Sequence, residues 1–190
     1  MKKAQPIRSK HQIRELTDYF LKRGEKRNYV LIVLGLYTAL RISDLLQLRW
    51  DDVYDFTNEC IYDSITITEK KTGKVKTIAL NENVKNALLL YLCEARSGKF
   101  ILSNKNTGNA ISRVQAHRII CKAADELKFQ NRVSCHSLRK TFGHQAWKSG
   151  VSPAILMEIY NHGSMSTTKH YLGVSQDDKD SVYLGLDLTT

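Results

Sequence analysis

The sequence predicts an α+β fold, a mostly helical domain with a small antiparallel β-sheet. Apolar residues recur at helical spacing through most of the chain. Residues 64–80 differ, because "SITITEKK" and "KVKTIAL" alternate apolar and polar side chains on either side of Thr72-Gly73, which indicates a β-hairpin with a tight turn. The 190 residues include two prolines and no repeat or Pro/Ser-rich linker. One compact domain over residues 1–190 is therefore expected.

Three helices are predicted before the hairpin. The first lies in an N-terminal helix and linker over residues 1–24; it begins after the N-cap candidate Ser9 and ends at Gly24. The stretch "RNYVLIVLGLYTAL" is apolar nearly all round, so we expect a buried helix. A short helix then begins at Ser43, a second N-cap candidate.

Helical spacing returns after the hairpin. It predicts helices over residues 82–95, 112–127, 136–150, 152–160 and 166–172. Residues 99–103, "KFILS", are predicted to form a short edge strand. In the tail, residues 174–190, Ser175 and Asp178 form a capping box for a final helix with apolar content. Packing of this tail on its own domain and docking on a neighbouring protomer both remain open.

The charge balance points to a polyanionic partner. The chain has 29 Lys and Arg residues against 19 Asp and Glu, a net charge of +10 and a pI near 9.5. A single domain this basic most often binds nucleic acid, with an anionic membrane as the second choice. Surface charge that serves solubility is the alternative interpretation.

The cysteines and apolar runs exclude several classes of protein. Cys60, Cys93, Cys121 and Cys135 are far apart, so neither a zinc site nor a disulfide framework is predicted, and reduced thiols fit a cytoplasmic protein. The start "MKKAQPIRSKHQIREL" carries charge but no apolar signal-peptide core. The longest apolar run, "YVLIVLGLYTAL", is too short to span a bilayer, and no membrane partner is expected.

Two arginines are candidates for binding an anion. His136 and Arg139 lie at i and i+3 of one predicted helix and share a face that can reach one small anion, although such a pair alone is more often solvated surface. Arg41 ends the buried helix, where a charge is costly without a partner. An ion pair with Asp44 or Asp51 is the alternative interpretation of Arg41.

Lys71 and Tyr171 gain meaning from their neighbourhoods. Lys71 lies at the hairpin turn, where most lysines protect a sheet edge, yet a stiff turn can also project a lysine into a cleft. Tyr171 is one of nine tyrosines. It follows His162 and a loop containing Gly and Ser, on a short polar helix where core packing is a weaker interpretation.

Four motifs together resemble the catalytic domain of the tyrosine recombinase (phage integrase) family. "TALRISDLLQLRWDD" resembles the first arginine motif of the family, "KKTGKVKTIAL" its lysine-bearing hairpin, "HSLRKTFGHQAWKSGV" its His-x-x-Arg helix, and "YNHGSMSTTKHYL" its second histidine and nucleophile. Each motif alone is modest, but four in the right order over nearly the whole chain are specific. The resemblance implies the fold predicted above and a site-specific DNA recombinase or integrase of mobile elements.

The resemblance assigns the central chemistry to four residues. Tyr171 would attack a DNA phosphodiester and leave a 3′-phosphotyrosyl link and a free 5′-hydroxyl. Arg41 and Arg139 would bind the non-bridging oxygens, because a planar guanidinium suits the developing charge. Lys71 would give a proton to the leaving 5′-oxygen. A tyrosine with an ordinary pKa of about 10 needs such a cluster of cations to attack near neutral pH.

Three more residues receive supporting roles by the same resemblance. His136 would do acid or base work near the tyrosine, and His162 would hydrogen-bond the phosphate. Asp44 would orient His136 or Arg41. No metal or nucleotide cofactor is implied, because Arg, Lys and His neutralise the charge and the phosphotyrosyl bond conserves the energy for rejoining.

Double-stranded DNA is the implied partner, bound by a homotetramer, with accessory DNA-binding proteins as further partners. Helical phase and charge predict additional DNA contacts from the outward face of the helix over residues 112–127, through Arg113 and His117. Lys140, beside Arg139, is predicted to add another DNA contact.

The chain departs from the family pattern in two respects. Tyr160-Asn161-His162 stands where relatives commonly have Leu-Gly-His, so different packing is expected before His162. The first arginine motif begins near residue 38, which leaves no room for the N-terminal core-binding domain of most members. A minimal single-domain protein and a fragment of a longer one are both open.

Three other functions compete with strand exchange. A type IB topoisomerase would share the same residues but relax DNA as a monomer without paired sites. A DNA-binding accessory protein without strand exchange would have no use for the complete residue set. A metal hydrolase built on His136, His144, His162 and His170 lacks nearby carboxylates.

Overall fold

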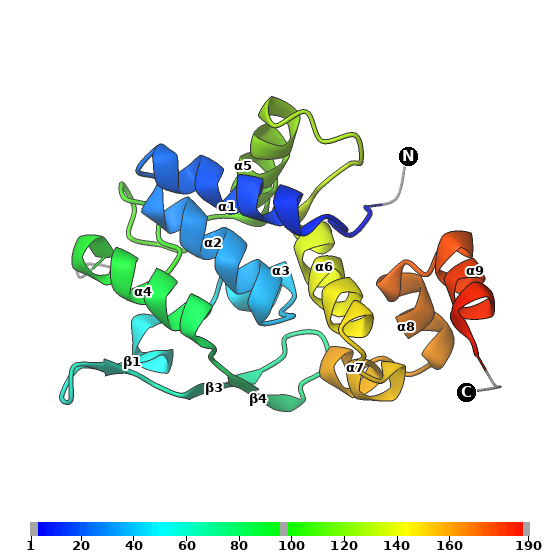
Figure 1. The fold of residues 1–190 in the computed structure, drawn as a ribbon. Helices are drawn as coiled ribbons and strands as arrows, with labels where there is room; N and C mark the ends of the chain where they lie inside the picture. Colours follow the sequence, from blue (N-terminus) through cyan, green and yellow to red (C-terminus); the bar gives the residue numbers. More distant parts are fainter. Residues whose placement is uncertain (1–3, 96–98, 188–190) are drawn as a thin grey trace.

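The computed structural model describes residues 4–95 and 99–187, and the prediction of an α+β fold is confirmed in these ranges (Figure 1). In chain order the elements are α1 (Lys10–Lys22), α2 (Lys26–Tyr37), α3 (Ile42–Leu45), a 3-10 helix (Trp50–Asp52), β1 (Tyr54–Asp55), β2 (Cys60–Ile61), β3 (Ser64–Thr68), β4 (Val75–Ala79), α4 (Glu82–Ala95), α5 (Arg113–Glu126), α6 (Cys135–Lys148), α7 (Pro153–Tyr160), α8 (Met165–Leu172) and α9 (Gln176–Gly185).

The predicted hairpin is present, but its turn is longer than expected. β3 and β4 pair antiparallel, with Ser64 opposite Ala79 and Thr68 opposite Val75. The chain between them, residues 69–74, forms a six-residue connection rather than a tight turn at Thr72-Gly73 alone. Gly73 has a φ of +67°, the left-handed conformation that glycine adopts at little cost.

The edge strand predicted over residues 99–103 is wrong. Phe100 and Ser103 each form only an isolated bridge, to Arg49 and Ala110 respectively. Ile101 and Leu102 between them are both fully buried, whereas an edge strand would alternate its side chains between core and solvent. Core burial of consecutive residues therefore overrides the strand pattern. The two-stranded sheet of β1 and β2 was not predicted.

Helix α2 is the centre of the domain, as its continuous apolar sequence predicts. Its residues from Val30 to Leu36 are all buried, and it packs against α1, α4 and α6. Helices α7 and α8 lie on the far side of α6, next to each other (Figure 1). A second, smaller apolar cluster of Ala39, Leu156, Tyr160 and Leu172 joins these helices to the end of α2.

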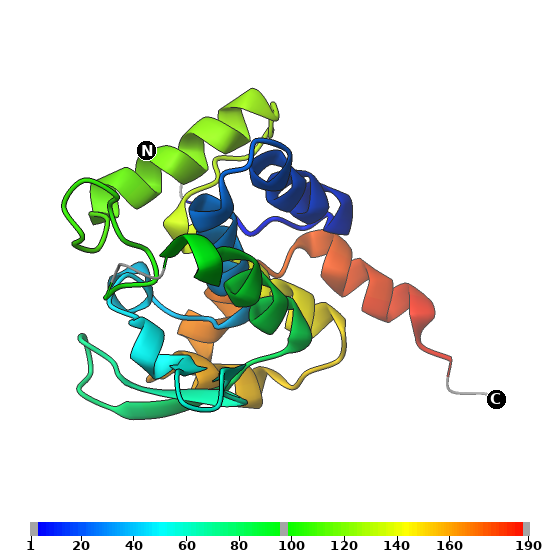
Figure 2. The same cartoon turned by 90° about the vertical axis from the view of Figure 1, so that its left-hand side faces the viewer.

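Helix α9 projects away from the body of the domain (Figure 2). The predicted capping box is present, because Ser175 N donates to Asp178 Oδ2 at 2.8 Å and Asp178 N donates to Ser175 Oγ at 3.3 Å. Lys148 at the end of α6 forms an ion pair with Asp178. Within the described residues, no helix is both long and apolar enough to cross a membrane.

Candidate active site

A cleft of about 950 Å³ collects residues that lie far apart in the sequence. Its walls come from the junction of α2 and α3, the connection between β3 and β4, and helices α5, α6 and α8. Arg41, Lys71, His136, Arg139 and Tyr171 all line it. The four motifs found in the sequence therefore meet at one site.

Arg139 extends from α6 and is held by backbone carbonyls of two other segments. Its side chain is 2% exposed. Nη1 donates to the Ala39 carbonyl after α2, and Nη2 donates to the Tyr160 carbonyl at the end of α7, at 3.0 Å. Nε has no hydrogen-bond partner in the described part of the chain. A nearly buried, unpaired donor beside a cleft is suited to an anionic ligand.

Arg41 lies beside Arg139 and has a different partner from those expected. It occupies the N-cap position of α3, where Ser43 was predicted, but its side chain forms no capping hydrogen bond. Its Nη1 forms an ion pair with Glu69 Oε1 at 2.7 Å rather than with Asp44 or Asp51. Its Nη2 donates to the Tyr160 carbonyl at 3.4 Å, the same oxygen that Arg139 binds. Burial, followed by the charge of Arg41, lowers the pKa of Arg139. Because these two positive charges lie close together, binding of an anion in the cleft that Arg41 and Arg139 line is electrostatically favourable.

Tyr171 lies between two histidines on the floor formed by α6 and α8. Its hydroxyl is 3.5 Å from His136 Nδ1. The ring centroids of His136 and His162 are 4.8 and 4.5 Å from that of Tyr171, each with edge-on geometry. His162 does not line the cleft directly; it contacts Thr168 Oγ1 through Nδ1 at 3.1 Å.

Both histidines are neutral near pH 7. Burial, and then the charges of Lys140 and Arg139, lower the pKa of His136 to about 4. Burial, and then the charges of Arg139 and Arg41, lower the pKa of His162 to about 4 as well. A neutral imidazole can accept a proton from a phenol, whereas an imidazolium cannot.

The connection between β3 and β4 brings Lys71 to the cleft. Lys71 is exposed and lines the cleft wall. The backbone beside it is fixed, because Lys70 N donates to Asp44 Oδ1 at 3.1 Å. Asp44 also accepts a weaker hydrogen bond from the Ser43 hydroxyl at 3.4 Å. Asp44 thus hydrogen-bonds to the turn that carries Lys71. The role expected from the resemblance was instead to orient His136 or Arg41.

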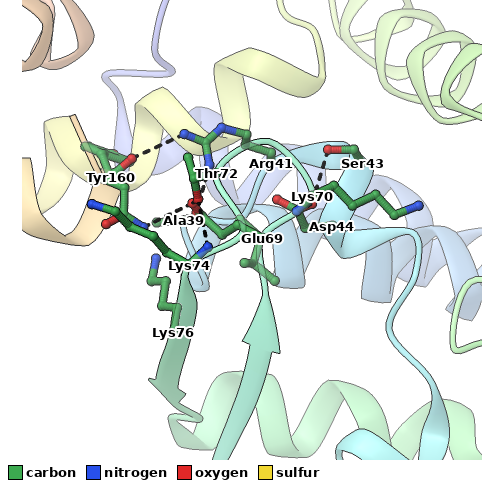
Figure 3. Close-up of polar contacts among 12 residues, drawn as sticks. Ala39, Arg41, Ser43, Asp44, Glu69, Lys70, Thr72, Lys74, Lys76 and Tyr160 are labelled. Carbon is green, nitrogen blue, oxygen red and sulfur yellow. Dashed lines mark hydrogen bonds and ion pairs between the residues drawn. The ribbon is translucent and has the colours of Figure 1, made fainter. Parts of the chain in front are cut away.

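Sequence reasoning missed two charged residues beneath the site, Glu69 and Lys76 (Figure 3). Lys76 Nζ donates to the Ile159 carbonyl at 2.7 Å, and burial, followed by the charge of Arg139, lowers the pKa of Lys76 to about 8. Glu69 is fully buried. In the sequence, both residues belong to a hairpin whose apolar and polar side chains alternate, so each is expected to face the solvent. Only their contacts with residues far away in the sequence show that they belong to the site.

The residues predicted to contact DNA separate into two groups. Arg113 and His117 on α5 line the same cleft as Tyr171 and Lys71. Lys140 does not face outward, since it is 4% exposed. Its ammonium donates to the Ala4 carbonyl at 3.1 Å and lies 5.6 Å from the Tyr171 ring centroid. The N-terminal segment covers Lys140, which the sequence around it does not indicate.

Solved structures identify the fold. The crystal structure of XerA recombinase matches with a TM-score of 0.77 at 20% identity, over 97% of this chain and 65% of that chain. XerH site-specific recombinase, solved bound to its palindromic difH substrate, matches with a TM-score of 0.75 at 18% identity, over 93% of this chain and 52% of that chain. The fold is that of tyrosine recombinase catalytic domains.

Sequence comparison then gives the family. Residues 8–177 match the model of the phage integrase family. The probable integrase/recombinase YoeC of Bacillus subtilis (strain 168) is 35% identical over 179 residues, which cover 94% of each chain. The chain belongs to the phage integrase family and comprises a tyrosine-type integrase/recombinase catalytic domain. It spans about half the length of other curated relatives, such as the TnP I resolvase of Bacillus thuringiensis, of which it covers 56%.

Proposed function

We propose that this chain cleaves and rejoins DNA strands through a 3′-phosphotyrosyl intermediate on Tyr171, as a site-specific recombinase or integrase. One observation carries the proposal: the Tyr171 hydroxyl is 3.5 Å from His136 Nδ1 and faces the cleft that Arg41, Arg139 and Lys71 line. A nucleophile, a neutral base and three cations around one space are suited to attack on a phosphodiester.

In the proposed step, Tyr171 Oη forms a bond to phosphorus and the bond from phosphorus to the 5′-oxygen breaks. The phenol proton passes to Nδ1 of His136, whose own proton is then on Nε2. The leaving 5′-oxygen takes a proton from Lys71. One phosphodiester is exchanged for another, so the reverse of the same step rejoins the strand without an external source of energy.

Arg41 and Arg139 bind the non-bridging oxygens in this proposal, and His162 adds a hydrogen bond. The negative charge on these oxygens grows as the five-coordinate transition state forms, so fixed donors stabilise that state more than the ground state. Support comes from the unpaired Arg139 Nε and from the closeness of the two guanidinium groups.

Trapping on a nicked duplex tests the proposal. Duplexes that tile the DNA flanking the gene carry a nick close to each potential cleavage point, so that the short 5′-hydroxyl fragment diffuses away and the adduct accumulates. Wild-type protein is expected to form a denaturant-resistant adduct, and Tyr171→Phe none. An equal yield of adduct from Tyr171→Phe contradicts the proposal.

A sulfur substitution tests the role of Lys71. When sulfur replaces the 5′-bridging oxygen at the scissile phosphate, the leaving thiolate needs no proton, because a thiol has a far lower pKa than an alcohol. Lys71→Ala is expected to cleave the normal duplex about a hundredfold more slowly than wild type and the sulfur duplex at nearly the wild-type rate. A variant equally slow on both duplexes contradicts the assignment.

We further propose that the tail over residues 174–190, of which residues 188–190 lie outside the described part, docks on a second copy of the chain, within a homotetramer assembled on DNA. Four apolar side chains of this region are 64–89% exposed: Val182, Tyr183, Leu184 and Leu186. Replacing Tyr183 and Leu184 by Ser should weaken assembly on DNA, measured by sedimentation. The control replaces Leu89 and Leu90 on α4, which are 46% and 42% exposed. Unchanged assembly of the tail variant contradicts the docking.

We also propose that this recombinase or integrase acts in the cytoplasm.

A further inference from the structure

Glu69 joins three segments of the candidate site through one buried carboxylate (Figure 3). Oε1 forms the ion pair with Arg41 Nη1 at 2.7 Å. Oε2 accepts a hydrogen bond from the Thr72 hydroxyl at 2.8 Å and another from Asn161 Nδ2 at 3.0 Å. These partners belong to the first arginine motif, to the turn that carries Lys71, and to the residue before His162.

Glu69 lies behind Arg41, on the side away from the cleft. Arg41 lines the cleft and keeps about one fifth of its side chain exposed, whereas the Glu69 side chain is 0% exposed and is not among the lining residues. Glu69 therefore contacts Arg41 from the interior of the protein, outside the space that a phosphate in the cleft would occupy. The carboxylate supports the arginine and does not compete with the phosphate.

The charges around Glu69 explain why an ionised carboxylate is retained there. Arg41, Arg139 and Lys76 are three cations in a poorly solvated region, and the charge of Glu69 favours the charged forms of both Arg139 and Lys76. Burial opposes ionisation of Glu69, but the hydrogen bonds from Thr72, Asn161 and Arg41 outweigh burial and lower its pKa. Without this anion the DNA-free site would hold uncompensated buried charge.

We propose that Glu69 is a positioning residue that fixes Arg41, the turn bearing Lys71 and the segment before His162 in one arrangement for strand cleavage. This inference rests on the proposed function. Bringing a phosphate-binding arginine and a proton donor to one phosphate requires their separation to be held within a fraction of an ångström. The Glu69 carboxylate can meet that requirement, because it pairs with Arg41 and also accepts a hydrogen bond from Thr72 in the turn that carries Lys71.

Two substitutions separate position from stability. Glu69→Gln keeps the size and the hydrogen bonds to Thr72 and Asn161 but removes the charge that orients Arg41. Glu69→Asp keeps the charge, and so folds even if Glu69→Gln does not, but draws the carboxylate about one bond length away from its three partners. Asp63→Asn is the matched control, because it removes one carboxylate from an ion pair with Lys85 at the start of the same hairpin, away from the cleft.

The first readout is cleavage of the nicked duplex over a range of DNA concentrations. Both Glu69 variants are expected to lower the adduct-forming rate at saturating DNA by about ten- to a hundredfold, with the half-saturating concentration changed by less than about threefold. Asp63→Asn should stay within about twofold of wild type on both measures. If the Glu69 variants lower the melting temperature but leave the cleavage rate of the folded protein unchanged, Glu69 only stabilises the fold. That result would overturn the proposal.

The second readout needs no activity. Arginine side-chain Nε–H resonances report the order of Arg41 in the DNA-free protein, and the Arg41 resonance is assigned through Arg41→Lys. Glu69→Gln should shift and broaden that resonance, whereas Asp63→Asn should not. An unchanged Arg41 resonance overturns the positioning role even if cleavage slows. If wild-type protein forms no adduct at all, the proposed function fails, and the resonance alone decides whether Glu69 orders Arg41.

Discussion

Tyr160 and Arg139 hold each other through two reciprocal hydrogen bonds. The Tyr160 hydroxyl donates to the Arg139 carbonyl at 2.7 Å, and Arg139 Nη2 donates to the Tyr160 carbonyl at 3.0 Å. The guanidinium carbon also lies 4.7 Å from the Tyr160 ring centroid. Burial raises the pKa of Tyr160, so its phenol stays a neutral donor. Tyr160 thus holds α7 against α6 and anchors the arginine.

Removing the Tyr160 hydroxyl tests this anchor. Tyr160→Phe is expected to lower the free energy of unfolding by about 1–2 kcal/mol, because one buried hydrogen bond is lost. It should also slow adduct formation at saturating DNA by several-fold as Arg139 gains freedom. Tyr91→Phe, at a buried tyrosine of α4 outside the cleft, should lower stability without slowing the adduct. Equal slowing by both variants would contradict a specific link between Tyr160 and Arg139.

Asn161 combines an unusual backbone with a side-chain contact. It ends α7 with a φ of 52° and ψ of 45°, the left-handed conformation in which glycine is favoured. Asn161→Gly keeps that backbone but loses the hydrogen bond to Glu69, whereas Asn161→Ala loses the bond and bears the backbone strain as well. Urea denaturation should therefore show Asn161→Ala less stable than Asn161→Gly by about 1 kcal/mol. Equal stability of the two would indicate that the helix end rearranges.

The neutral histidines predict a pH dependence of stability. The folded-state pKa values of His136 and His162 are about 4, below the ordinary value of 6.5. Between those limits the unfolded chain binds protons that the folded chain does not, so stability is greatest above pH 6.5 and falls as the pH drops toward 4. A variant with both histidines changed to Gln should lose less stability from pH 7 to pH 4.5 than wild type, by chemical denaturation. His11→Gln, on the exposed face of α1, is the control; parallel pH curves for wild type and the double variant would refute the assignment.

Arg113 tests the second wall of the cleft as a DNA contact. Arg113→Glu should weaken DNA binding and reduce the slope of log affinity against log salt by about 1, because about one phosphate contact is lost. Lys122→Glu reverses a charge on the same helix, at a 73% exposed lysine that does not line the cleft, and should leave the slope nearly unchanged. Similar slopes for Arg113→Glu and wild type would place the DNA elsewhere.

Local signals in the sequence were sufficient for most of the fold. The N-cap at Ser9, the capping box at Ser175 and the alternation in the hairpin each determine structure within a few residues, and all three are present. The N-cap predicted at Ser43 is wrong, because Ser43 lies inside α3. The edge strand predicted over residues 99–103 is wrong because core contacts, rather than an alternation of apolar and polar residues, decide the conformation of this segment.

The candidate site divides in the same way. The four motifs, in their order along the chain, correctly predict the residues that line the cleft. These are Arg41, Lys71, His136, Arg139 and Tyr171. Sequence reasoning could not find the partners that hold them. Glu69 meets Arg41 and Asn161 across separations of 28 and 92 residues, and Lys140 is covered by Ala4 from 136 residues away. Such contacts depend on tertiary packing, which leaves no mark in a local pattern.

Locating the DNA on the protein tests the central claim most directly. The adduct from a nicked duplex is digested with nuclease and trypsin, and mass spectrometry then identifies the residue that carries the remaining nucleotide. The account predicts a single modified residue, Tyr171, linked through a 3′-phosphate. A nucleotide attached to any other side chain, including the neighbouring Tyr160 or the exposed Tyr183, would contradict it.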